Sequence, residues 1–458
     1  MSHPISVDTP LKLVIRLAST PRELAYKALL AAEKDQSTGI DELLANFLQQ
    51  GELTQQEKRW IMELVYGVTR MKLQLDAWIE MAFKGRYRKA QHPLKSLLRM
   101  GVFQLKYMHT SEHAAINETV ALSRRVKQSQ ASGLVNAVLR KTQSLELEDL
   151  LNKSEDDLEH LSIETSHPQW LLEKWISRYT KDEVSAFCSH NNTAPKTWIR
   201  RNIQIVGAED FESFLDGLDI KYQKSDILDV FYEIGSASSL FSTKEFHGGW
   251  FSFQDLAAGL VASLIDPESG DTIVDACSAP GGKMAFISEL SGGQAKIIAC
   301  DASHSRLAKV RENILRLGLK QIEVLELDAA LEPLPAANKI LLDVPCSGTG
   351  VLNRRPDARW KRQASDILSL TVIQSNILTN SWKYLAPGGL LVYATCTVEP
   401  DENWELIDSV LEHLDQASVE AIDHENLKPY IDERGALSTL PWLHDMDGMF
   451  AVKIRKAL

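Results

Sequence analysis

The second half of this 458-residue chain carries the pattern that most constrains its fold. From about Phe241 onward, short runs of apolar residues alternate with helical patterns, such as Leu307, Val310, Ile314 and Leu317. Apolar strands separated by helices are typical of a parallel sheet that helices cover on both faces. We therefore predict a doubly wound α/β domain over residues 241–458. Its strands are expected at 272–276, 297–300, 322–327, 339–344, 390–394 and 450–454.

Two further folded parts are predicted before this domain. Residues 1–145 repeat apolar residues at helical spacing, as around Ile61, Leu64 and Val68, which indicates an all-helical domain. Residues 146–165 are strongly acidic and suit an exposed linker with one short helix. Residues 166–240 combine an amphipathic helix around Trp175 with strand-like alternation after Trp198, which indicates a small α+β domain of the RRM-like kind.

The chain has a net charge of −12, but its first 145 residues carry an excess of basic residues. Residues 1–145 contain 21 Lys and Arg against 13 Asp and Glu, and residues 81–111 contain no acid at all. Such cations often lie on solvated helix faces, where nearby carboxylates balance their charge. Because this stretch has no such carboxylates, contact with phosphate groups is an equally good interpretation. The phosphate contacts predicted here are Arg86, Arg88, Lys89, Arg124 and Arg125.

The cysteines and the amino terminus limit the class of protein. Charged residues interrupt the apolar ones in the first twenty positions, and no stretch reaches the roughly 18 apolar residues of a membrane span. We expect a cytoplasmic protein. The five cysteines are widely spaced and form no C-x-x-C pair, which argues against a disulfide framework and against a zinc site, so no metal is expected.

A turn of small residues follows the strand expected at 272–276. A turn of this kind lets a ligand approach the backbone and reach the amides that open the next helix. Asp301 and Asp328 end the next two strands, where a carboxylate can hold ribose hydroxyls. These acids favour an adenosine ligand, although spacing alone leaves both a methyl donor and a nicotinamide open. The turn consists of Cys277, Ser278, Ala279, Pro280, Gly281, Gly282 and Lys283.

Two cysteines follow later strands of the same predicted sheet. Cys346 comes shortly after a strand that ends in Asp343, and Cys396 follows the strand at 390–394. Singly, each could be an ordinary small buried residue. Together they suit the methylation of cytosine, because a thiolate that adds to carbon 6 makes carbon 5 nucleophilic. A carboxyl group such as Asp343 at ring nitrogen 3 would neutralise the developing charge.

Three motifs resemble those of the RNA cytosine-5 methyltransferase family: D-A-C-S-A-P-G-G-K at 275–283, D-V-P-C-S-G-T-G at 343–350 and A-T-C-T-V-E-P-D-E-N at 394–403. The resemblance implies a class I, Rossmann-like methyltransferase fold with S-adenosylmethionine as the cofactor. It implies that residues 277–283, Asp301, Asp328 and Asp343 line the cofactor site. It also implies that Asp343 contacts the substrate, that Cys396 attacks and that Cys346 assists release.

The front of the chain also carries a resemblance. Y-G-V-T-R at 66–70, L-R-M-G at 98–101, N-E-T-V at 117–120 and N-A-V-L-R at 136–140 are similar to the NusB-like domain of that family's bacterial enzymes for small-subunit ribosomal RNA. The resemblance implies 16S ribosomal RNA as the partner, as free RNA or in an assembly intermediate. We expect a monomer. The chain departs from the family at Thr397, which replaces the more usual Ser, and at residues 353–356, where the basic pair is shifted by one position.

A cationic segment at 354–362 surrounds Trp360. Single-stranded RNA is commonly held by cations beside an aromatic platform, and a splayed-out cytosine would give a thiol access to its ring. We predict RNA contacts from Arg354, Arg355 and Arg359 against the alternative of ordinary surface charge. Two other functions stay open, which are the same chemistry on another rRNA or tRNA cytosine, and a non-catalytic RNA-binding assembly factor.

Overall fold

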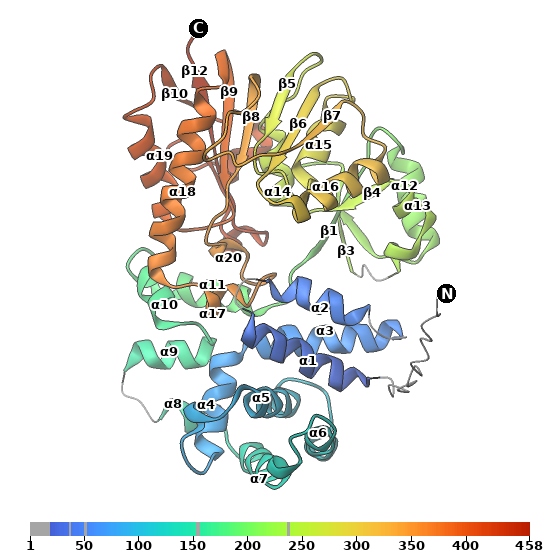
Figure 1. The fold of residues 1–458 in the computed structure, drawn as a ribbon, viewed down its shortest axis with the longest axis vertical. Helices are drawn as coiled ribbons and strands as arrows, with labels where there is room; N and C mark the ends of the chain where they lie inside the picture. The colour runs from blue at the N-terminus through green and yellow to red at the C-terminus, as the bar shows by residue number, and fades with distance from the viewer. Residues whose placement is uncertain (1–18, 36–37, 50–52, 153–155, 236–238) are drawn as a thin grey trace, which may run out of the picture. The chain divides into compact units, whose positions relative to one another are not determined.

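The computed structural model describes residues 19–35, 38–49, 53–152, 156–235 and 239–458. The chain divides into two compact units, Met1–Glu155 and Asp156–Leu458, which Figure 1 colours from blue to teal and from green to red. No helix in the described ranges combines the length and the apolar character that crossing a membrane requires.

The first unit is helical, as predicted. The side chains of Ile61, Leu64 and Val68 lie in its interior. Thr20 and Thr54 cap two of its helices through capping boxes with Glu23 and Glu57, which satisfy backbone groups at the helix starts. The helices are α1 (Pro21–Lys34), α2 (Ile40–Leu48), α3 (Gln55–Arg70), α4 (Lys72–Ala82), α5 (His92–Lys106), α6 (Glu112–Arg125), α7 (Ser132–Gln143) and α8 (Leu147–Leu151).

One cation of the acid-free stretch is internal to this unit. Arg99 on α5 donates to both carboxylate oxygens of Asp76, at 2.7 and 2.6 Å, and to Glu33 Oε1 at 2.7 Å. Its guanidinium is almost completely buried. The compensating carboxylates that residues 81–111 lack therefore come from α1 and α4.

The acidic segment at 146–165 contains two short helices, one more than predicted. The helix α8 packs on α4 of the first unit, whereas α9 (Asp157–Thr165) packs on α10 (Gln169–Ile176) and α11 (Lys181–Asn192) of the second. Leu172, Trp175 and Phe187 from α10 and α11 share a core with Leu352 and Val398, which lie beside the later motifs. These helices therefore support the loops that carry those motifs.

A small antiparallel sheet follows in the order β2-β3-β1-β4, which confirms the predicted α+β part. Phe211, Tyr232 and Phe251 fill its core. The strand β4 lies beyond the expected boundary at residue 240, because the chain returns to pair with β1 after α13 (Lys244–His247). The other elements are β1 (Thr197–Arg201), α12 (Ala208–Gly217), β2 (Tyr222–Lys224), β3 (Phe231–Ile234) and β4 (Phe251–Phe253).

The large sheet has the order β10-β12-β9-β8-β5-β6-β7, and β11 pairs with β12. The strands from β9 to β7 along this order are parallel, as predicted, but β12 runs antiparallel to β9. A strand that is buried on both faces has the same apolar pattern whether it runs parallel or antiparallel to its neighbour. The sequence pattern therefore could not predict the direction of β12. The strands are β5 (Thr272–Asp275), β6 (Lys296–Asp301), β7 (Ile322–Glu326), β8 (Ala337–Asp343), β9 (Leu385–Thr395), β10 (Ala417–Glu420), β11 (Leu437–Ser438) and β12 (Phe450–Lys456).

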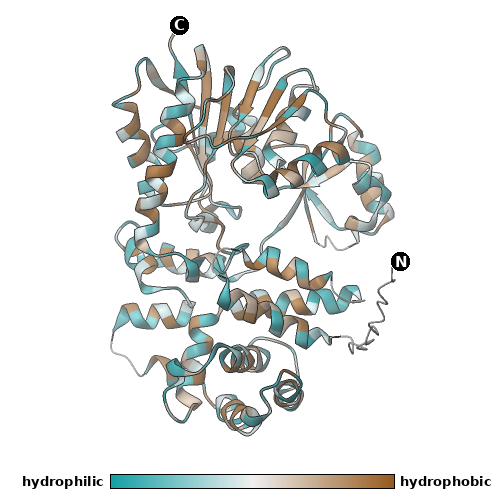
Figure 2. Ribbon diagram, viewed as in Figure 1, coloured by the Kyte–Doolittle hydropathy of each residue, from teal (hydrophilic) through white to brown (hydrophobic). Residues whose placement is uncertain are grey.

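Helices cover both faces of this sheet (Figure 1). Ile273 and its neighbours pack against α14 (Leu256–Ser263), α15 (Gly282–Leu290) and α16 (His304–Leu317). Val274 points to the opposite face, toward α18 (Ala364–Trp382) and α19 (Trp404–Leu411). Figure 2 shows strands of the sheet as mostly hydrophobic, in agreement with burial on both sides.

The direction in which strands are added reverses at β5. The chain proceeds from β5 outward to β6 and β7, and then returns to place β8 on the other side of β5. Ligands of doubly wound sheets bind beyond the carboxyl ends of the strands at such a reversal. The loops after β5 and β8, which carry two of the three motifs, both leave the sheet there.

We predict that Arg99→Met destabilises the first unit by about 1–3 kcal/mol, because it removes an almost completely buried guanidinium that donates to the half-buried carboxylates of Asp76 and Glu33. Amide hydrogen exchange in α4 and α5 of the intact chain measures the effect. The control is Arg86→Met, which removes an exposed cation and should change stability by less than about 0.5 kcal/mol. Equal effects of the two variants would show that the Arg99 cluster is not a stabilising element.

Candidate active site

The loop after β5 brings backbone close to the ligand edge of the sheet. Gly281 has φ +97°, which a side chain would strain, and an added Cβ would lie 3.3 Å from Met284 Cε. The helix α15 begins at the next residue and has no side-chain cap. Its first amides are therefore presented at the sheet edge, as a negatively charged or polar ligand group requires.

The predicted cofactor residues gather around this loop. The Asp301 carboxylate accepts from Ser303 N at 2.9 Å and Ala279 N at 3.3 Å, so it ties the loop to the end of β6. Arg306 Nη1 lies 3.3 Å from the same carboxylate. Asp328, beyond β7, is half-buried and accepts from Ala330 N at 2.9 Å. Asp301 and Asp328 thus lie at the carboxyl ends of the neighbouring strands β6 and β7.

A buried carboxyl group, that of Asp275, shows whether the residues at this edge of the sheet suit a cationic cofactor. Asp275 ends β5, and neither of its oxygens has a hydrogen-bond partner within the described residues. Burial, together with the nearby charge of Asp343, raises the pKa of Asp275 to about 7. A ligand with positive charge would stabilise its ionised form. S-adenosylmethionine carries positive charge on its sulfonium and its ammonium group, so the residues at this edge fit it.

Lys283 joins the loops after β5 and β8. Its Nζ lies 2.6 Å from Asp343 Oδ2. Burial alone would lower the pKa of Lys283, but the Asp343 carboxylate outweighs it and the pKa is raised. The lysine therefore remains a cation beside Asp343, at the point where the two motifs meet.

Cys346 and Cys396 lie side by side, with 3.2 Å between their sulfur atoms. Both are half-buried, and the Cys396 amide donates to Cys346 Sγ at 3.3 Å. The hydrogen bond between the thiols and burial raise the pKa of Cys346, whereas the same hydrogen bond and the cations of Arg355 and Lys283 lower the pKa of Cys396. Cys396 is therefore the sulfur that ionises more readily, and the thiolate is the nucleophilic form.

Hydroxyl groups join the two cysteine loops. Thr397 Oγ1 lies 2.8 Å from Ser347 Oγ and 2.7 Å from Thr349 Oγ1, and all three side chains are buried. The hydroxyl at position 397 thus makes the contacts on which the loop geometry rests. The departure from Ser to Thr at this position keeps that hydroxyl.

Two arginines of the cationic segment at 354–362 pair with other groups inside the protein. Arg359 is 1% exposed and donates to Ser166 O, Asn191 O and Asn192 Oδ1 at 2.9–3.1 Å. The expectation that Arg359 contacts RNA is wrong, because its guanidinium is enclosed by α9 and α11.

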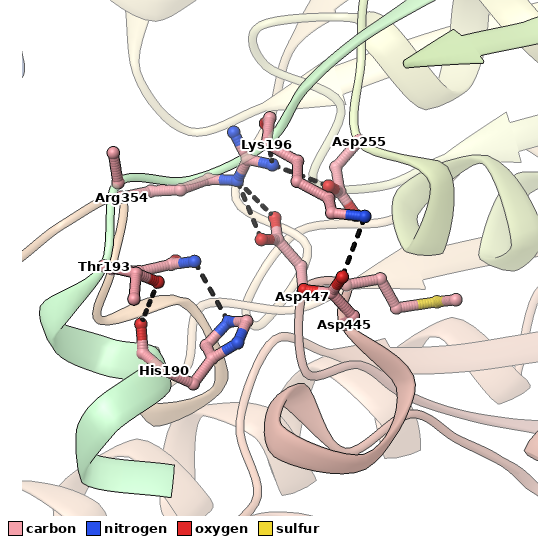
Figure 3. A pocket seen from close by; sticks show the side chains of 10 residues that line it. His190, Thr193, Lys196, Asp255, Arg354, Asp445 and Asp447 are labelled. Carbon is pink, nitrogen blue, oxygen red and sulfur yellow. Dashed lines mark hydrogen bonds and ion pairs between the residues drawn. The ribbon is translucent and has the colours of Figure 1, made fainter. Parts of the chain in front are cut away.

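Arg354 is also committed within the protein. It bridges Asp255 at 2.6 Å and Asp447 at 2.7 Å in a cleft of about 20 Å³, which has room for about one water molecule (Figure 3). His190 and Lys196 line the same cleft. The charge of Arg354 is balanced by Asp255 and Asp447, so its surroundings do not support the prediction that Arg354 contacts RNA.

The remaining predicted cations are exposed. Arg355 is exposed and its charge acts on the Cys396 thiol. In the first unit Arg88 lies 3.3 Å from Glu80 and Arg125 lies 3.2 Å from Glu23, both in partly exposed pairs. Arg86, Lys89 and Arg124 are exposed as well.

A buried ion pair that the sequence did not single out holds the helix of the cofactor loop. Arg200 on β1 donates to both oxygens of Glu289 on α15, at 3.0 and 2.6 Å, and both side chains are completely buried. Arg200 Nη1 also donates to Gly282 O at 3.2 Å and to Gln254. The only signal in the sequence was a pair of arginines, Arg200 and Arg201, inside an otherwise strand-like run.

Solved structures share this architecture. The chain "Crystal Structure of PH0851" has a TM-score of 0.81 at 21% identity and covers 96% of this chain and all of its own. "The crystal structure of NSun6 from Pyrococcus horikoshii with SFG" has a TM-score of 0.57 at 22% identity, covering 64% and 98% of the two chains. These likenesses support the Rossmann-like fold. Fold and site together define a methyltransferase that uses S-adenosylmethionine.

Sequence comparisons place the chain more narrowly. Residues 262–455 match the family described as 16S rRNA methyltransferase RsmB/F, residues 19–144 match the NusB family, and residues 167–230 match the RsmF/B-like ferredoxin-like domain. "Probable ribosomal RNA small subunit methyltransferase B" of Bacillus subtilis (strain 168) is 31% identical over 444 residues, or 95% of this chain and 98% of that protein. "Ribosomal RNA small subunit methyltransferase B" of Pseudomonas putida is 34% identical over 407 residues, covering 85% and 88%.

The chain therefore belongs to the RsmB/F family of 16S rRNA methyltransferases. It is an rRNA methyltransferase with S-adenosylmethionine as its cofactor, and the predicted NusB-like front and small α+β domain are confirmed.

We predict that Arg200→Met lowers the stability of the second unit by about 3–5 kcal/mol, because Glu289 is left buried with an unpaired charge. The double variant Arg200→Met/Glu289→Met should recover most of that loss, since no charge then remains in the core. Urea unfolding of the two variants and the wild type measures both effects. A harmless single variant, or a double variant no more stable than the single one, would contradict this account of the pair.

Proposed function

We propose that this rRNA methyltransferase methylates carbon 5 of a cytosine in 16S ribosomal RNA, with Cys396 as the covalent nucleophile and Cys346 assisting release. The observation that supports this most directly is the thiol pair, 3.2 Å apart, in which Cys396 ionises more readily than its neighbour. A methyl acceptor on oxygen or on an exocyclic nitrogen would need no such pair.

In the proposed reaction the Cys396 thiolate adds to carbon 6 of the cytosine, and a carbon–sulfur bond forms. The electron pair of the carbon 5–carbon 6 double bond moves into the ring, which leaves carbon 5 nucleophilic. Asp343 in its protonated form gives a proton to ring nitrogen 3 as negative charge develops there, and the Lys283 ammonium stabilises the carboxylate that results. The nitrogen 3 proton returns to Asp343 when the cytosine ring is restored. S-adenosylmethionine supplies the methyl group when bound.

Release requires the loss of the carbon 5 proton. A base takes this proton, the carbon–hydrogen electron pair re-forms the ring double bond, and the carbon–sulfur bond breaks to return the Cys396 thiolate. We place Cys346 in this step because it is the group that contacts the departing sulfur. Its thiol stabilises that sulfur as negative charge returns to it.

The RNA contacts proposed for the described residues follow from exposure. Arg355 holds the target nucleotide next to Cys396, and Arg86, Arg88, Lys89, Arg124 and Arg125 contact phosphates elsewhere on the RNA. Asp301 and Asp328 hold the ribose of the donor. We expect the protein to act as a monomer on RNA that is free or in an assembly intermediate.

The proposal is tested by incubating the protein and methyl-labelled donor with 16S rRNA and, in separate reactions, with other ribosomal RNA and with tRNA, followed by nucleoside analysis and bisulfite mapping. Label in 5-methylcytidine at one position is the expected result. Label in any other nucleoside would overturn the chemistry, and label in tRNA or in a different ribosomal RNA would correct the substrate.

We predict that Cys396→Ala abolishes methyl transfer, whereas Cys346→Ala accumulates protein bonded to RNA because release is slowed. Denaturing gels with labelled RNA detect the adduct, and filter assays measure transfer. The control is Cys188→Ala, which removes a buried thiol outside the site and should leave transfer unchanged. Ordinary transfer by both site variants would exclude the two-thiol mechanism.

We also predict a pH effect of Arg355. Because this cation lowers the pKa of Cys396, the acid limb of the single-turnover rate lies below the ordinary thiol range. Arg355→Gln should move that limb to higher pH, so activity is lost most at low pH and recovers as pH rises. Arg362→Gln, in the same segment, should leave the profile in place. A uniform loss at every pH would assign Arg355 to RNA binding alone.

A further inference from the structure

A buried carboxyl group beneath the cysteine loops has no role in the mechanism above. Glu402, at the end of the short helix η5 (Pro400–Glu402), is 0% exposed. Its Oε1 accepts from Ser347 N at 2.8 Å and from Gln374 Nε2 at 2.9 Å, and its Oε2 contacts the Ser347 hydroxyl. A carboxyl group is seldom completely buried unless partners of this kind hold it.

These contacts hold in place the residues immediately before and after Cys346. Ser347, on one side of the cysteine, is held by Glu402, and Pro345, on the other side, is held because its carbonyl accepts from Gln374 Nε2 at 2.9 Å. Both N–H groups of Gln374 are thereby used. Burial raises the pKa of Glu402, and the hydrogen bonds from Ser347 and Gln374 act in the opposite direction. Because two N–H donors point at Oε1, these hydrogen bonds favour the carboxylate form against the effect of burial.

The charged groups around the two sulfur atoms differ. The charged or titratable groups that act on Cys396 are Cys346, Asp343, Arg355 and Lys283. Those that act on Cys346 are Cys396 and Glu402, and Tyr393 also interacts with it. Arg355 and Lys283 favour negative charge on Cys396 and Asp343 opposes it, whereas the charged partner of Cys346 besides Cys396 is Glu402, whose carboxylate opposes negative charge there.

We propose that Glu402 is a positioning residue that assigns different tasks to the two cysteines, by holding Cys346 in place as a neutral thiol beside the Cys396 thiolate. The proton shared by the two sulfurs then rests on Cys346. The raised pKa of Cys346, to which Glu402 contributes, agrees with this geometry. The consequence for release rests on the proposed function, but the state of the thiol does not.

Glu402→Gln separates the charge from the hydrogen bonds. The amide oxygen can accept from Ser347 N and Gln374, while the amide nitrogen donates to the Ser347 hydroxyl, so the loop keeps its contacts. The matched control is Glu405→Gln, which removes the same charge from the exposed face of α19. Melting temperatures of both variants establish that they are folded.

The first test uses the full chain with Cys396→Ser, which leaves Cys346 as the thiol of the pair. Alkylation by iodoacetamide at pH 7.5 is followed by peptide mass spectrometry, with Cys277 as an internal reference. Glu402→Gln should speed alkylation of Cys346 more than twofold relative to Cys277, because a larger fraction of the thiol is ionised once the carboxylate charge is removed. A change of less than twofold, or an equal change with Glu405→Gln, would overturn the proposal.

A second measurement needs no Glu402 variant. In the Cys396→Ser protein with Glu402 intact, Cys346 should react at least about tenfold more slowly than a free cysteine in an unfolded peptide of the same sequence. An equal rate at both sites would overturn the proposal even if Glu402→Gln failed to fold.

The consequence for catalysis is tested with RNA and donor in the protein that retains both cysteines. Glu402→Gln should accumulate several-fold more covalent RNA adduct than Glu405→Gln, because an ionised Cys346 stabilises the departing sulfur less well. Faster alkylation without extra adduct would uphold the role of Glu402 and count against the release role of Cys346. The alkylation result uses neither RNA nor donor, so it stands apart from the identity of the methylated base.

Discussion

The parallel pairing of β8 with β9 is the constraint on which the site depends. Asp343 is paired with Ala394 in this register, so the chain leaves both strands at the same level of the sheet. Cys346 and Cys396 follow within three residues of these positions and meet at 3.2 Å. A shift of the register by one pair would move one sulfur by about 3.3 Å and separate the thiols.

The electrostatics of the site follow from the loops that meet there. Lys283 reaches Asp343 from the start of α15, Arg355 acts on Cys396 from the segment after β8, and Glu402 lies beneath Cys346. Two identical side chains thereby acquire different protonation preferences, because burial and neighbouring charges act on each of them differently. In a chain that is acidic as a whole, the hydrogen bond with Cys346 and the cations Arg355 and Lys283 together lower the pKa of Cys396.

The small sheet is part of the catalytic structure. Phe231 from β3 packs edge to face on Phe286 of α15, and the buried pair of Arg200 with Glu289 joins β1 to the same helix. Gly259 in α14 makes this contact possible, since a Cβ there would overlap the Phe231 ring. The cofactor loop at the start of α15 is therefore supported from outside the large sheet, through contacts between elements far apart in the sequence.

The sequence by itself determined the helical front, the small α+β part, the parallel strands and the strand-end motifs, because apolar periodicity and contiguous motifs are local properties of a chain. It also placed Cys346, Cys396 and Asp343 at one edge, since the carboxyl ends of parallel strands coincide. Only the tertiary structure decided the direction of β12 and the partners of Arg99, Arg200, Arg354 and Arg359. A cation can pair with any carboxylate that folding brings within reach, and Arg200 and Glu289 are 89 positions apart. No local sequence pattern shows which residues far apart in the chain lie close together in the fold. Arginines that were predicted to contact RNA from the sequence, such as Arg359, are for this reason found paired within the protein.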